Sequence, residues 1–345
     1  MKALFAAGGT GGHLYPAFAI AEALRARGDD VLFVGTSDRL EGKLVPEAGY
    51  RLATIPAHPL SRKLSLDLAR TATRNLAGVA QSLRILRRER PDVVVATGGY
   101  VCVPVAIAAR LRHRRPPIAL LEPNAISGVA NRLLQPLADE VWRPETTGVP
   151  VRASLLHLPA RSEAVARLGL DAAKKTLFAF GASQGARSIN DAAIALAQSG
   201  LPEGWQLLLA TGDADYERVR AAIGARATVR RYLDDPADAY AAADLVLSRA
   251  GASTLAELAA LRIPAILVPY PHATEAHQGA NAVAAAANGA AVVIEDARLR
   301  DGLRSLLAEV ATPARLAAMR ECAPRRDRDA TSAVLARIDA LVSRT

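Results

Sequence analysis

Short apolar runs alternate with longer amphipathic stretches along both halves of the chain. Apolar runs bounded by Gly, Pro and polar residues are typical of buried strands, and the stretches between them are typical of helices. This alternation predicts a parallel, doubly wound sheet in each half. The predicted strands are 2–7, 31–35, 50–55, 93–96, 118–122 and 140–142 in the first half, and 176–180, 206–211, 228–231, 245–248, 265–269 and 290–294 in the second.

The strand–helix pattern is interrupted by Gly and Pro at residues 146–152 and then restarts. A chain of 345 residues is long enough for two α/β domains with separate cores. We expect an N-terminal domain at 1–149 and a C-terminal domain at 150–325. A final helix at about 327–342 is free to pack back on the first domain, so we assign about 326–345 to that domain.

Three loops of the second half each follow a predicted strand and open a helix. Such junctions point helix N–H groups and the positive end of the helix dipole at one spot, which favours a diphosphate-bearing ligand. A fourth, glycine-rich loop follows the first strand of the chain. Because ligands collect at the carboxyl ends of strands in doubly wound sheets, we expect the four loops to converge on a cleft between the domains. The loops span 181–187, 248–257, 277–281 and 8–13.

The glycine loop at 8–13 does not have the G-x-G-x-x-G spacing, and Gly35 and Thr36 stand where a dinucleotide-binding strand would end in an acidic residue. A nicotinamide cofactor is therefore disfavoured, and the missing G-K-[ST] ending excludes a P-loop. Backbone without side chains can approach a ligand closely, and His13 would lie beside that ligand. The alternative, a tight turn with a capping or buried histidine, is equally consistent with this loop alone.

Two acidic groups in the second half have competing interpretations. Glu257 lies one turn after Ser253 and Thr254, where it can accept hydrogen bonds from a cis-diol such as a ribose; the spacing itself favours a capping box. Asp213 and Asp215 match the acidic pattern of metal-dependent sugar transferases, but their position before a helix favours an N-cap.

The net charge of +9 is uneven, since residues 1–150 hold 20 Lys and Arg against 13 Asp and Glu. The basic clusters at residues 62–90 and 110–115 indicate either that the protein binds an acidic surface or substrate, or simply that it has a solvated basic face. Leucines and cations alternate at 60–66, a segment that is either a headgroup contact or an ordinary loop. A helical stripe of Leu76, Val79, Leu83 and Leu86 is predicted to be mostly core.

The cysteine content, the apolar runs and the aromatic content further limit the class of protein. Two cysteines without C-x-x-C spacing fit a reducing compartment, and no structural metal is implied. The first residues are too short a run for a signal peptide, and no apolar run reaches the length of a membrane-spanning helix. An aromatic content of 4% argues against a base-stacking, nucleic-acid-binding surface.

Taken together and in order, six motifs resemble the bacterial MurG glycosyltransferase family along nearly the whole chain. The resemblance implies a GT-B fold, with two doubly wound Rossmann-like domains facing across a cleft. Residues 1–149, with 326–345, would form the acceptor- and membrane-facing domain, and 150–325 the UDP-GlcNAc-binding domain. It also implies inverting transfer of N-acetylglucosamine from UDP-GlcNAc to the 4-hydroxyl of the muramyl sugar of undecaprenyl-pyrophosphoryl-MurNAc-pentapeptide (lipid I), making lipid II for peptidoglycan synthesis. The motifs lie at residues 8–17, 97–100, 122–124, 181–187, 248–254 and 277–282.

The resemblance also implies roles for individual residues. His13 would be the catalytic candidate near the acceptor hydroxyl. Glu257 would hold the ribose diol, Leu233 the uracil edge, and Gln278 and Asn124 the sugar. Arg152 and Ser183 would serve the nucleotide and its phosphates. The complete set of UDP-GlcNAc contacts is Thr10, Gly11, Gly12, Asn124, Arg152, Ser183, Leu233, Ala252, Ser253, Thr254, Leu255, Ala256, Glu257 and Gln278.

Three positions depart from the family pattern. Pro123 stands where a Gln is common, Leu121 where a His is common, and Ala276 where an acidic residue is usual. These departures concern contacts to the donor sugar.

By the same resemblance, the partners would be UDP-GlcNAc, lipid I and the anionic inner leaflet, with no cofactor, no metal and no nucleic acid. The protein would be peripheral on the cytoplasmic face of the membrane and would serve cell-wall synthesis, cell division and cell shape. Leu60, Arg62, Lys63 and Leu64 are the candidate membrane contacts. The alternatives are another GT-B enzyme using a UDP-sugar, such as a soluble 2-epimerase or a small-molecule glycosyltransferase, and a non-catalytic nucleotide-sugar-binding protein.

Overall fold

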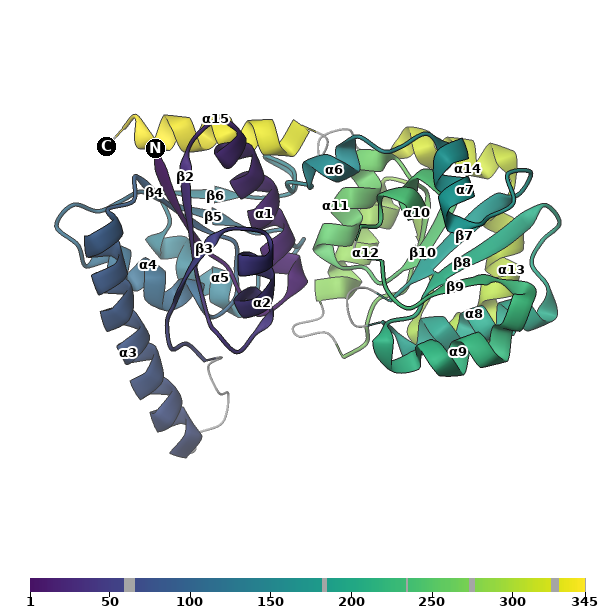
Figure 1. The fold of residues 1–345 in the computed structure, drawn as a ribbon, viewed down its shortest axis with the longest axis horizontal. Helices are drawn as coiled ribbons and strands as arrows, with labels where there is room; N and C mark the ends of the chain where they lie inside the picture. Colours follow the sequence, from purple (N-terminus) through teal and green to yellow (C-terminus); the bar gives the residue numbers. More distant parts are fainter. Residues whose placement is uncertain (59–65, 182–184, 234, 273–276, 324–328, 345) are drawn as a thin grey trace. The chain divides into compact units, whose positions relative to one another are not determined.

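The structure, a computed structural model, describes residues 1–58, 66–181, 185–233, 235–272, 277–323 and 329–344, and of 66–72 it describes only the backbone. The chain forms two compact units (Figure 1). Unit 1 comprises Met1–Arg152 together with Asp329–Thr345, and unit 2 comprises Ala153–Arg328. Each unit is built on its own six-stranded sheet.

The sheet of unit 1 is parallel throughout, in the order β3-β2-β1-β4-β5-β6. Its central strands are apolar on both faces because helices cover both sides, as parallel sheets require. All six strands therefore end at one carboxyl edge. They are β1 (Lys2–Ala6), β2 (Asp30–Gly35), β3 (Arg51–Thr54), β4 (Val93–Ala96), β5 (Ile118–Leu121) and β6 (Glu140–Trp142).

Two helical layers enclose this sheet. On one face, α1 and α15 pack together, and Val334, Ile338 and Leu341 of α15 join the core formed with α1. On the other face, α3 packs along α4, and Ile85 and Leu86 of α3 join the core formed with α4 and the sheet (Figure 1). The helices of unit 1 are α1 (Gly11–Ala26), α2 (Leu40–Glu47), α3 (Leu66–Glu89), α4 (Cys102–Arg110), α5 (Val129–Leu134) and α15 (Ala330–Val342).

Unit 2 repeats this architecture with the strand order β12-β11-β10-β7-β8-β9, again all parallel. The three strands β11, β10 and β7 are neighbours at the centre of the sheet. This adjacency matters because each is followed by one of the candidate ligand loops. The strands are β7 (Lys175–Phe180), β8 (Trp205–Ala210), β9 (Thr228–Arg230), β10 (Leu245–Ser248), β11 (Ala265–Leu267) and β12 (Ala291–Val293).

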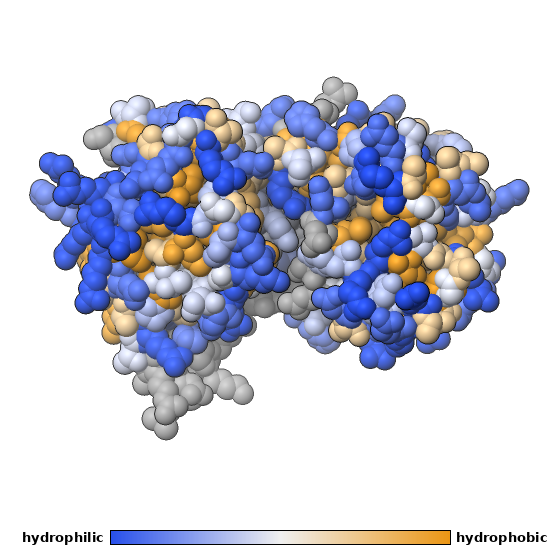
Figure 2. Space-filling model, in the orientation of Figure 1, coloured by the Kyte–Doolittle hydropathy of each residue, from blue (hydrophilic) through white to orange (hydrophobic). Residues whose placement is uncertain are grey.

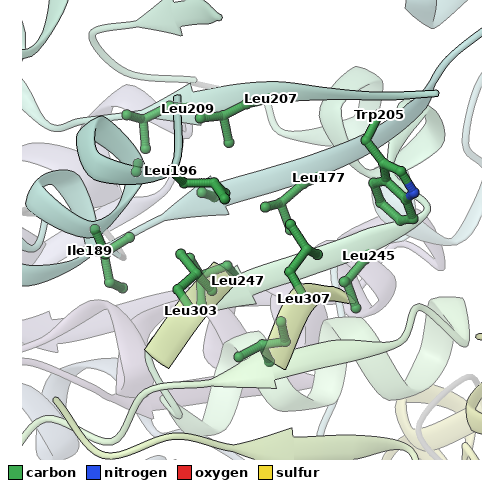
Figure 3. Packing of buried hydrophobic residues seen from close by; sticks show 14 of the residues in the cluster. Leu177, Ile189, Leu196, Trp205, Leu207, Leu209, Leu245, Leu247, Leu303 and Leu307 are labelled. Carbon is green, nitrogen blue, oxygen red and sulfur yellow. The ribbon is translucent and has the colours of Figure 1, made fainter. Parts of the chain in front are cut away.

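The core of unit 2 is a leucine-rich layer between the sheet and α8, α9, α13 and α14. Figure 3 shows Leu303 and Leu307 of α13 against Leu177, Leu245 and Leu247 of the sheet. Tyr240 and Phe178 lie on the opposite face and meet edge to face. The helices are α6 (Ala153–Leu156), α7 (Arg161–Leu168), α8 (Arg187–Ser199), α9 (Tyr216–Ile223), α10 (Ala237–Ala242), α11 (Ala252–Leu261), α12 (His277–Ala287), α13 (Leu299–Val310) and α14 (Pro313–Cys322).

The prediction of two doubly wound sheets is confirmed, and each of the twelve predicted strands coincides with an observed one to within about two residues. The helical stripe is mostly core, as predicted, with one exposed member. Leu86 of the predicted leucine stripe is buried, and Val79 and Leu83 pack partly against the core, but Leu76 is 68% exposed. Among the described residues, no helix is both long and apolar enough to cross a bilayer.

Candidate active site

The glycine loop of unit 1 places a helix N-terminus at the carboxyl edge of β1. Helix α1 begins at Gly11 with Thr10 as its N-cap, and the Thr10 side chain makes no capping hydrogen bond. Gly9 has a φ of +90°, a conformation that favours glycine. The first N–H groups of α1 lie at this edge, and Gly11 and Gly12 have no side chains to keep a ligand from the backbone. The loop therefore has the form expected of an anion or sugar contact.

His13 lies in the first turn of α1 and contacts the loop that follows β4. Its Nδ1 is 3.0 Å from the carbonyl oxygen of Thr97. A carbonyl can only accept, so this bond requires the proton on Nδ1 and leaves the lone pair of the neutral ring on Nε2. A Cβ at Gly98 would lie 2.5 Å from His13 Nδ1, so only glycine fits beneath the imidazole. The ring thus has a fixed tautomer and orientation, as a general base needs.

Asn124 is held in place by the buried carboxylate of Glu122 at the end of β5. Glu122 Oε1 accepts hydrogen bonds from the Asn124 backbone N–H and side-chain amide, both at 3.0 Å. Its other oxygen accepts from Gly128 N–H at 3.2 Å and from the Asn131 amide at 2.8 Å. The Asn124 side chain is half-buried at the same edge of the sheet as His13. Glu122 therefore fixes the loop that carries this predicted sugar contact.

Three loop–helix junctions of unit 2 meet at one edge of its sheet. Helices α8, α11 and α12 follow β7, β10 and β11, which are neighbouring strands, so their N-termini lie side by side. The first junction is tight, because a Cβ on Gly185 would lie 2.2 Å from the Thr211 carbonyl oxygen. Convergent helix N-termini provide the N–H groups and partial positive charge that a diphosphate needs.

Glu257 is buried on α11 and contacts a tyrosine of α10. The Tyr240 hydroxyl donates to Glu257 Oε2 at 2.7 Å. Helix α11 begins at Ala252 with Gly251 as its N-cap, so Ser253 and Thr254 lie inside the first turn. The capping-box interpretation of Glu257 is therefore wrong.

Arg249, which was not singled out from the sequence, links the loop after β10 to the start of α8 and to the segment after β11. Its guanidinium is almost fully buried and forms an ion pair with Asp296. It also donates to Ser188 Oγ at 2.9 Å in the first turn of α8, and to the Val268 carbonyl oxygen at 3.3 Å after β11. A single side chain thus ties the first turn of α8 and the segment after β11 to the loop after β10.

Helix α12 is anchored to the same group of loops. Gln278 Oε1 accepts a hydrogen bond from Tyr270 N–H at 3.0 Å, and the Asn281 amide donates to the Ala250 carbonyl oxygen at 3.2 Å. The predicted uracil contact, Leu233, lies half-buried in the segment after β9.

Arg152 is assigned to unit 1, and its guanidinium carbon lies 4.9 Å from the centre of the Tyr15 ring on α1. This cation–π contact places Arg152 beside the first turns of α1.

Asp215 occupies the N-cap position of α9, as predicted, but its side chain makes no capping bond. It accepts from Arg218 at 2.6 and 2.7 Å and from the Asn190 amide at 2.8 Å. Hydrogen bonding by Arg218 is the main reason that the pKa of Asp215 lies below its usual value. Its carboxylate serves the structure of α8 and α9.

Five predicted site residues lie outside the described residues. They are the phosphate contact Ser183 and the membrane contacts Leu60, Arg62, Lys63 and Leu64.

Two family models match the chain, one on each sheet. Residues 3–142 match the N-terminal domain of glycosyltransferase family 28, and residues 176–334 match its C-terminal domain.

Curated relatives match most of the chain. A protein of Halothermothrix orenii is 40% identical over 326 residues, with 87% of each chain covered, and one of Chlorobium luteolum is 43% identical over 325 residues with the same coverage. Both bear the name UDP-N-acetylglucosamine--N-acetylmuramyl-(pentapeptide) pyrophosphoryl-undecaprenol N-acetylglucosamine transferase.

Solved structures agree with these matches. The crystal structure of Acinetobacter baumannii MurG superposes with a TM-score of 0.76 at 26% identity, covering 98% of this chain and 99% of that one. The structure of S. aureus MnaA with UDP superposes with a TM-score of 0.70 at 14% identity, covering 99% and 98% of the two chains, which shows a shared fold alone.

Proposed function

Since the chain belongs to glycosyltransferase family 28, we propose that it transfers N-acetylglucosamine from UDP-GlcNAc to the N-acetylmuramyl sugar of pentapeptide-pyrophosphoryl-undecaprenol, converting lipid I to lipid II. The observation that carries this proposal is identity of 40% and 43% to transferases of that name over 87% of both chains. A glycosyltransferase of this specificity supplies the precursor for peptidoglycan, and through it serves cell division and cell shape.

The donor is assigned to unit 2. Its diphosphate would lie at the converging N-termini of α8, α11 and α12, with Ser183 and Arg152 as further phosphate or nucleotide contacts. Glu257 would accept hydrogen bonds from the ribose diol, in the orientation that Tyr240 imposes. Backbone N–H groups and helix dipoles absorb the charge that develops on the departing UDP and need no reorganisation to do so.

The remaining donor contacts follow the family pattern. Leu233 would contact the uracil, Gln278 and Asn124 the sugar, and residues 252–257 the nucleotide along the start of α11. Thr10, Gly11 and Gly12 would contact the donor from the glycine loop. The hydrogen bonds of Gln278 to Tyr270 and of Asn124 to Glu122 fix both loops before ligand arrives.

Catalysis is assigned to His13. Transfer from an α-linked donor to a β-1,4 product is a single inversion, in which a base takes the proton of the acceptor 4-hydroxyl as the sugar passes through an oxocarbenium-like state. The Thr97 carbonyl holds the proton on Nδ1, so Nε2 is the nitrogen that would take the proton. UDP leaves as the new glycosidic bond forms.

We further assign the protein to the cytoplasmic face of the membrane, as a peripheral protein. The acceptor carries a C55 lipid, so the enzyme must reach a bilayer surface. Leu111 at the end of α4 is 65% exposed, and Leu76 on α3 is exposed as well. Arg112 lies near enough to Arg87 and Arg90 that burial and then these two positive charges lower the pKa of its guanidinium.

We call the cluster formed by Arg87, Arg90, Arg112, Arg114 and Arg115 the basic surface. It brings together the two cationic clusters seen in the sequence, and four of its five arginines are exposed. Figure 2 shows hydrophilic residues gathered over the C-terminal end of α3, where this surface lies. Cations beside an exposed leucine such as Leu111 are typical of a surface that binds anionic lipid headgroups.

Incubation with UDP-GlcNAc, with and without a lipid I analogue, tests the proposal. We expect UDP and a disaccharide product only when both substrates are present. Conversion of UDP-GlcNAc without acceptor would instead indicate a 2-epimerase, and binding without turnover in either reaction would indicate a nucleotide-sugar-binding protein.

A further inference from the structure

A buried carboxylate that the reaction described above does not use lies behind the glycine loop. Glu41 is the second residue of α2 and is completely buried. Its Oε2 accepts a hydrogen bond from Gly9 N–H at 3.0 Å. Its Oε1 accepts from Thr36 N–H at 3.1 Å and from Thr36 Oγ1 at 2.7 Å. One carboxylate therefore joins the loop after β1 to the loop after β2, with each oxygen assigned to a different loop.

The backbone on both sides is shaped to admit this carboxylate. A Cβ at Gly8 would lie 2.6 Å from Glu41 Oε1, and a Cβ at Gly35 would lie 2.6 Å from Glu41 Cγ. Neither distance is possible for a real side chain in this packing. Gly8 and Gly35 thus leave the space that Glu41 fills, and the glycine loop takes part of its shape from a side chain 32 residues away.

The braced loop leads directly to His13. Gly9 precedes the N-cap of α1, whose first turn contains His13. The Gly8 carbonyl packs on Gly99, where a Cβ would lie 2.4 Å from the Gly8 oxygen, and the neighbouring Thr97 carbonyl accepts from His13 Nδ1. A shift of the Gly8–Gly9 backbone would therefore move the start of α1 against the loop that orients the imidazole.

We propose that Glu41 is a positioning residue, which acts through the Gly9 N–H to hold the glycine loop and His13 in the geometry for proton transfer. This inference rests on the proposed function, in which His13 is the base. A positioning error far smaller than a bond length is enough to lower turnover, since proton transfer requires hydrogen-bond distance and alignment.

Glu41→Gln is a sharp test because it keeps size and shape but replaces one acceptor oxygen by an NH₂ donor. Whichever way the amide turns, either Gly9 N–H or Thr36 N–H then faces another donor. We expect kcat to fall about 10- to 100-fold, with the affinity for UDP unchanged within about twofold. Glu47→Gln, at the exposed end of the same helix, is the matched control and should leave kcat unchanged. Thr36→Val, which removes one donor to Glu41, should give a smaller loss.

A double-mutant cycle separates positioning from general weakening of the fold. If Glu41 acts through His13, Glu41→Gln should lower the residual turnover of His13→Ala by less than about twofold. An equal loss in both backgrounds, or turnover of Glu41→Gln equal to that of Glu47→Gln, would overturn the inference.

A readout independent of the reaction completes the test. Amide hydrogen exchange of Gly9, followed by NMR, should accelerate in Glu41→Gln, and the His13 ring signals should shift. The His13→Ala spectrum assigns those signals among the six histidines. Unchanged Gly9 exchange would overturn the inference even for a protein that transferred no sugar, whereas an inactive parent with accelerated exchange would count against the proposed function alone.

Discussion

The contact between Tyr240 and Glu257 determines how this carboxylate can meet a ligand. The phenol donates to Oε2 at 2.7 Å, and the glutamate is 9% exposed on the first turns of α11. A buried acceptor already oriented by one donor loses little conformational freedom when a ligand donates to it. The same burial makes any unmade hydrogen bond expensive.

Glu257→Ala should therefore weaken UDP binding by about 1–3 kcal/mol, the cost of losing charged hydrogen bonds to a diol. Tyr240→Phe should cause a smaller loss, since it removes the orientation of the carboxylate but keeps the acceptor. Isothermal titration with UDP measures both. Glu309→Ala, at an exposed glutamate of α13, is the control and should bind as the parent does. Normal UDP affinity in Glu257→Ala would remove the ribose role from this residue.

His13→Ala should fold, bind UDP normally and lose about 10²- to 10⁴-fold in turnover, the usual range for a positioned general base. The physical reason is the fixed tautomer, because the hydrogen bond to Thr97 leaves the lone pair of the imidazole on Nε2. Steady-state turnover with a soluble acceptor measures the loss. His113→Ala, which replaces an exposed histidine of the same unit, should leave turnover unchanged. Turnover within threefold of the parent, with chemistry rate-limiting, would exclude the role.

At the scale of the elements, strands were the most predictable feature. Runs such as Val93–Ala96 are apolar at every position, as strands buried on both faces must be, so that length and flanking residues identify them. Helix caps were less predictable. The start of α11 depends on the conformation of Gly251, and spacing alone placed the cap at Ser253 or Thr254.

The parts of the site that the sequence did not predict share one cause. Glu41 hydrogen-bonds Gly9 across 32 positions, and Arg249 reaches Ser188 across 61. Such pairs produce no periodic pattern in the sequence, because the number of residues between them depends on the order of strands in the sheet and not on a helix or strand repeat. Leu76 shows the converse, because a regular leucine stripe does not reveal where the helix extends beyond the core it covers.

Glu89 joins three elements of unit 1 and makes their association sensitive to acid. At the end of α3 it accepts hydrogen bonds from Arg51 of β3 at 2.9 Å and from Lys2 of β1 at 3.3 Å. Hydrogen bonding by Arg51, and then by Lys2 and Arg88, lowers the pKa of Glu89 from 4.5 to about 2 against the effect of burial. The folded chain therefore holds this proton less tightly than the unfolded chain does.

Protonation should consequently destabilise unit 1 as the pH falls. The contribution of Glu89 to stability is complete above about pH 4.5 and is lost as the pH falls toward 2. In Glu89→Gln, the free energy of unfolding should depend less steeply on pH between 5 and 2. Urea unfolding at each pH measures this slope. Glu22→Gln, at an exposed position of α1, should retain the parent slope. Equal slopes in all three proteins would contradict the prediction.

At the scale of the whole molecule, part of the positive charge that distinguishes the first half of the sequence is gathered in the basic surface. Residues 1–150 hold 20 Lys and Arg and 13 Asp and Glu, and the five arginines of the basic surface are among those 20. Arg84 and Arg88 lie on the same helix. A leaflet of anionic lipid would attract such a surface in a salt-dependent way, with each nearby cation contributing about 1 kcal/mol.

Binding to anionic vesicles should therefore weaken with salt and in Arg112→Glu/Arg115→Glu, while activity on a water-soluble acceptor stays unchanged. Vesicle sedimentation measures the binding. Arg300→Glu/Arg304→Glu, two exposed positions on α13, is the charge-matched control. Arg62→Glu/Lys63→Glu tests the leucine and cation segment in the same way. Equal binding to neutral and anionic vesicles would show that the basic surface is only a solvated face.

The return of the chain to unit 1 at Asp329 has a consequence for the order in which the protein is made. Unit 2 is continuous in sequence, so all of it is synthesised before α15 appears. Until then, α1 lacks the helix whose Val334, Ile338 and Leu341 complete its core. Unit 2 can thus fold on the ribosome before unit 1 is complete. Until its final 17 residues are made, unit 1 has an uncovered apolar strip on α1. Premature termination within α15 would leave unit 2 complete and unit 1 prone to aggregate.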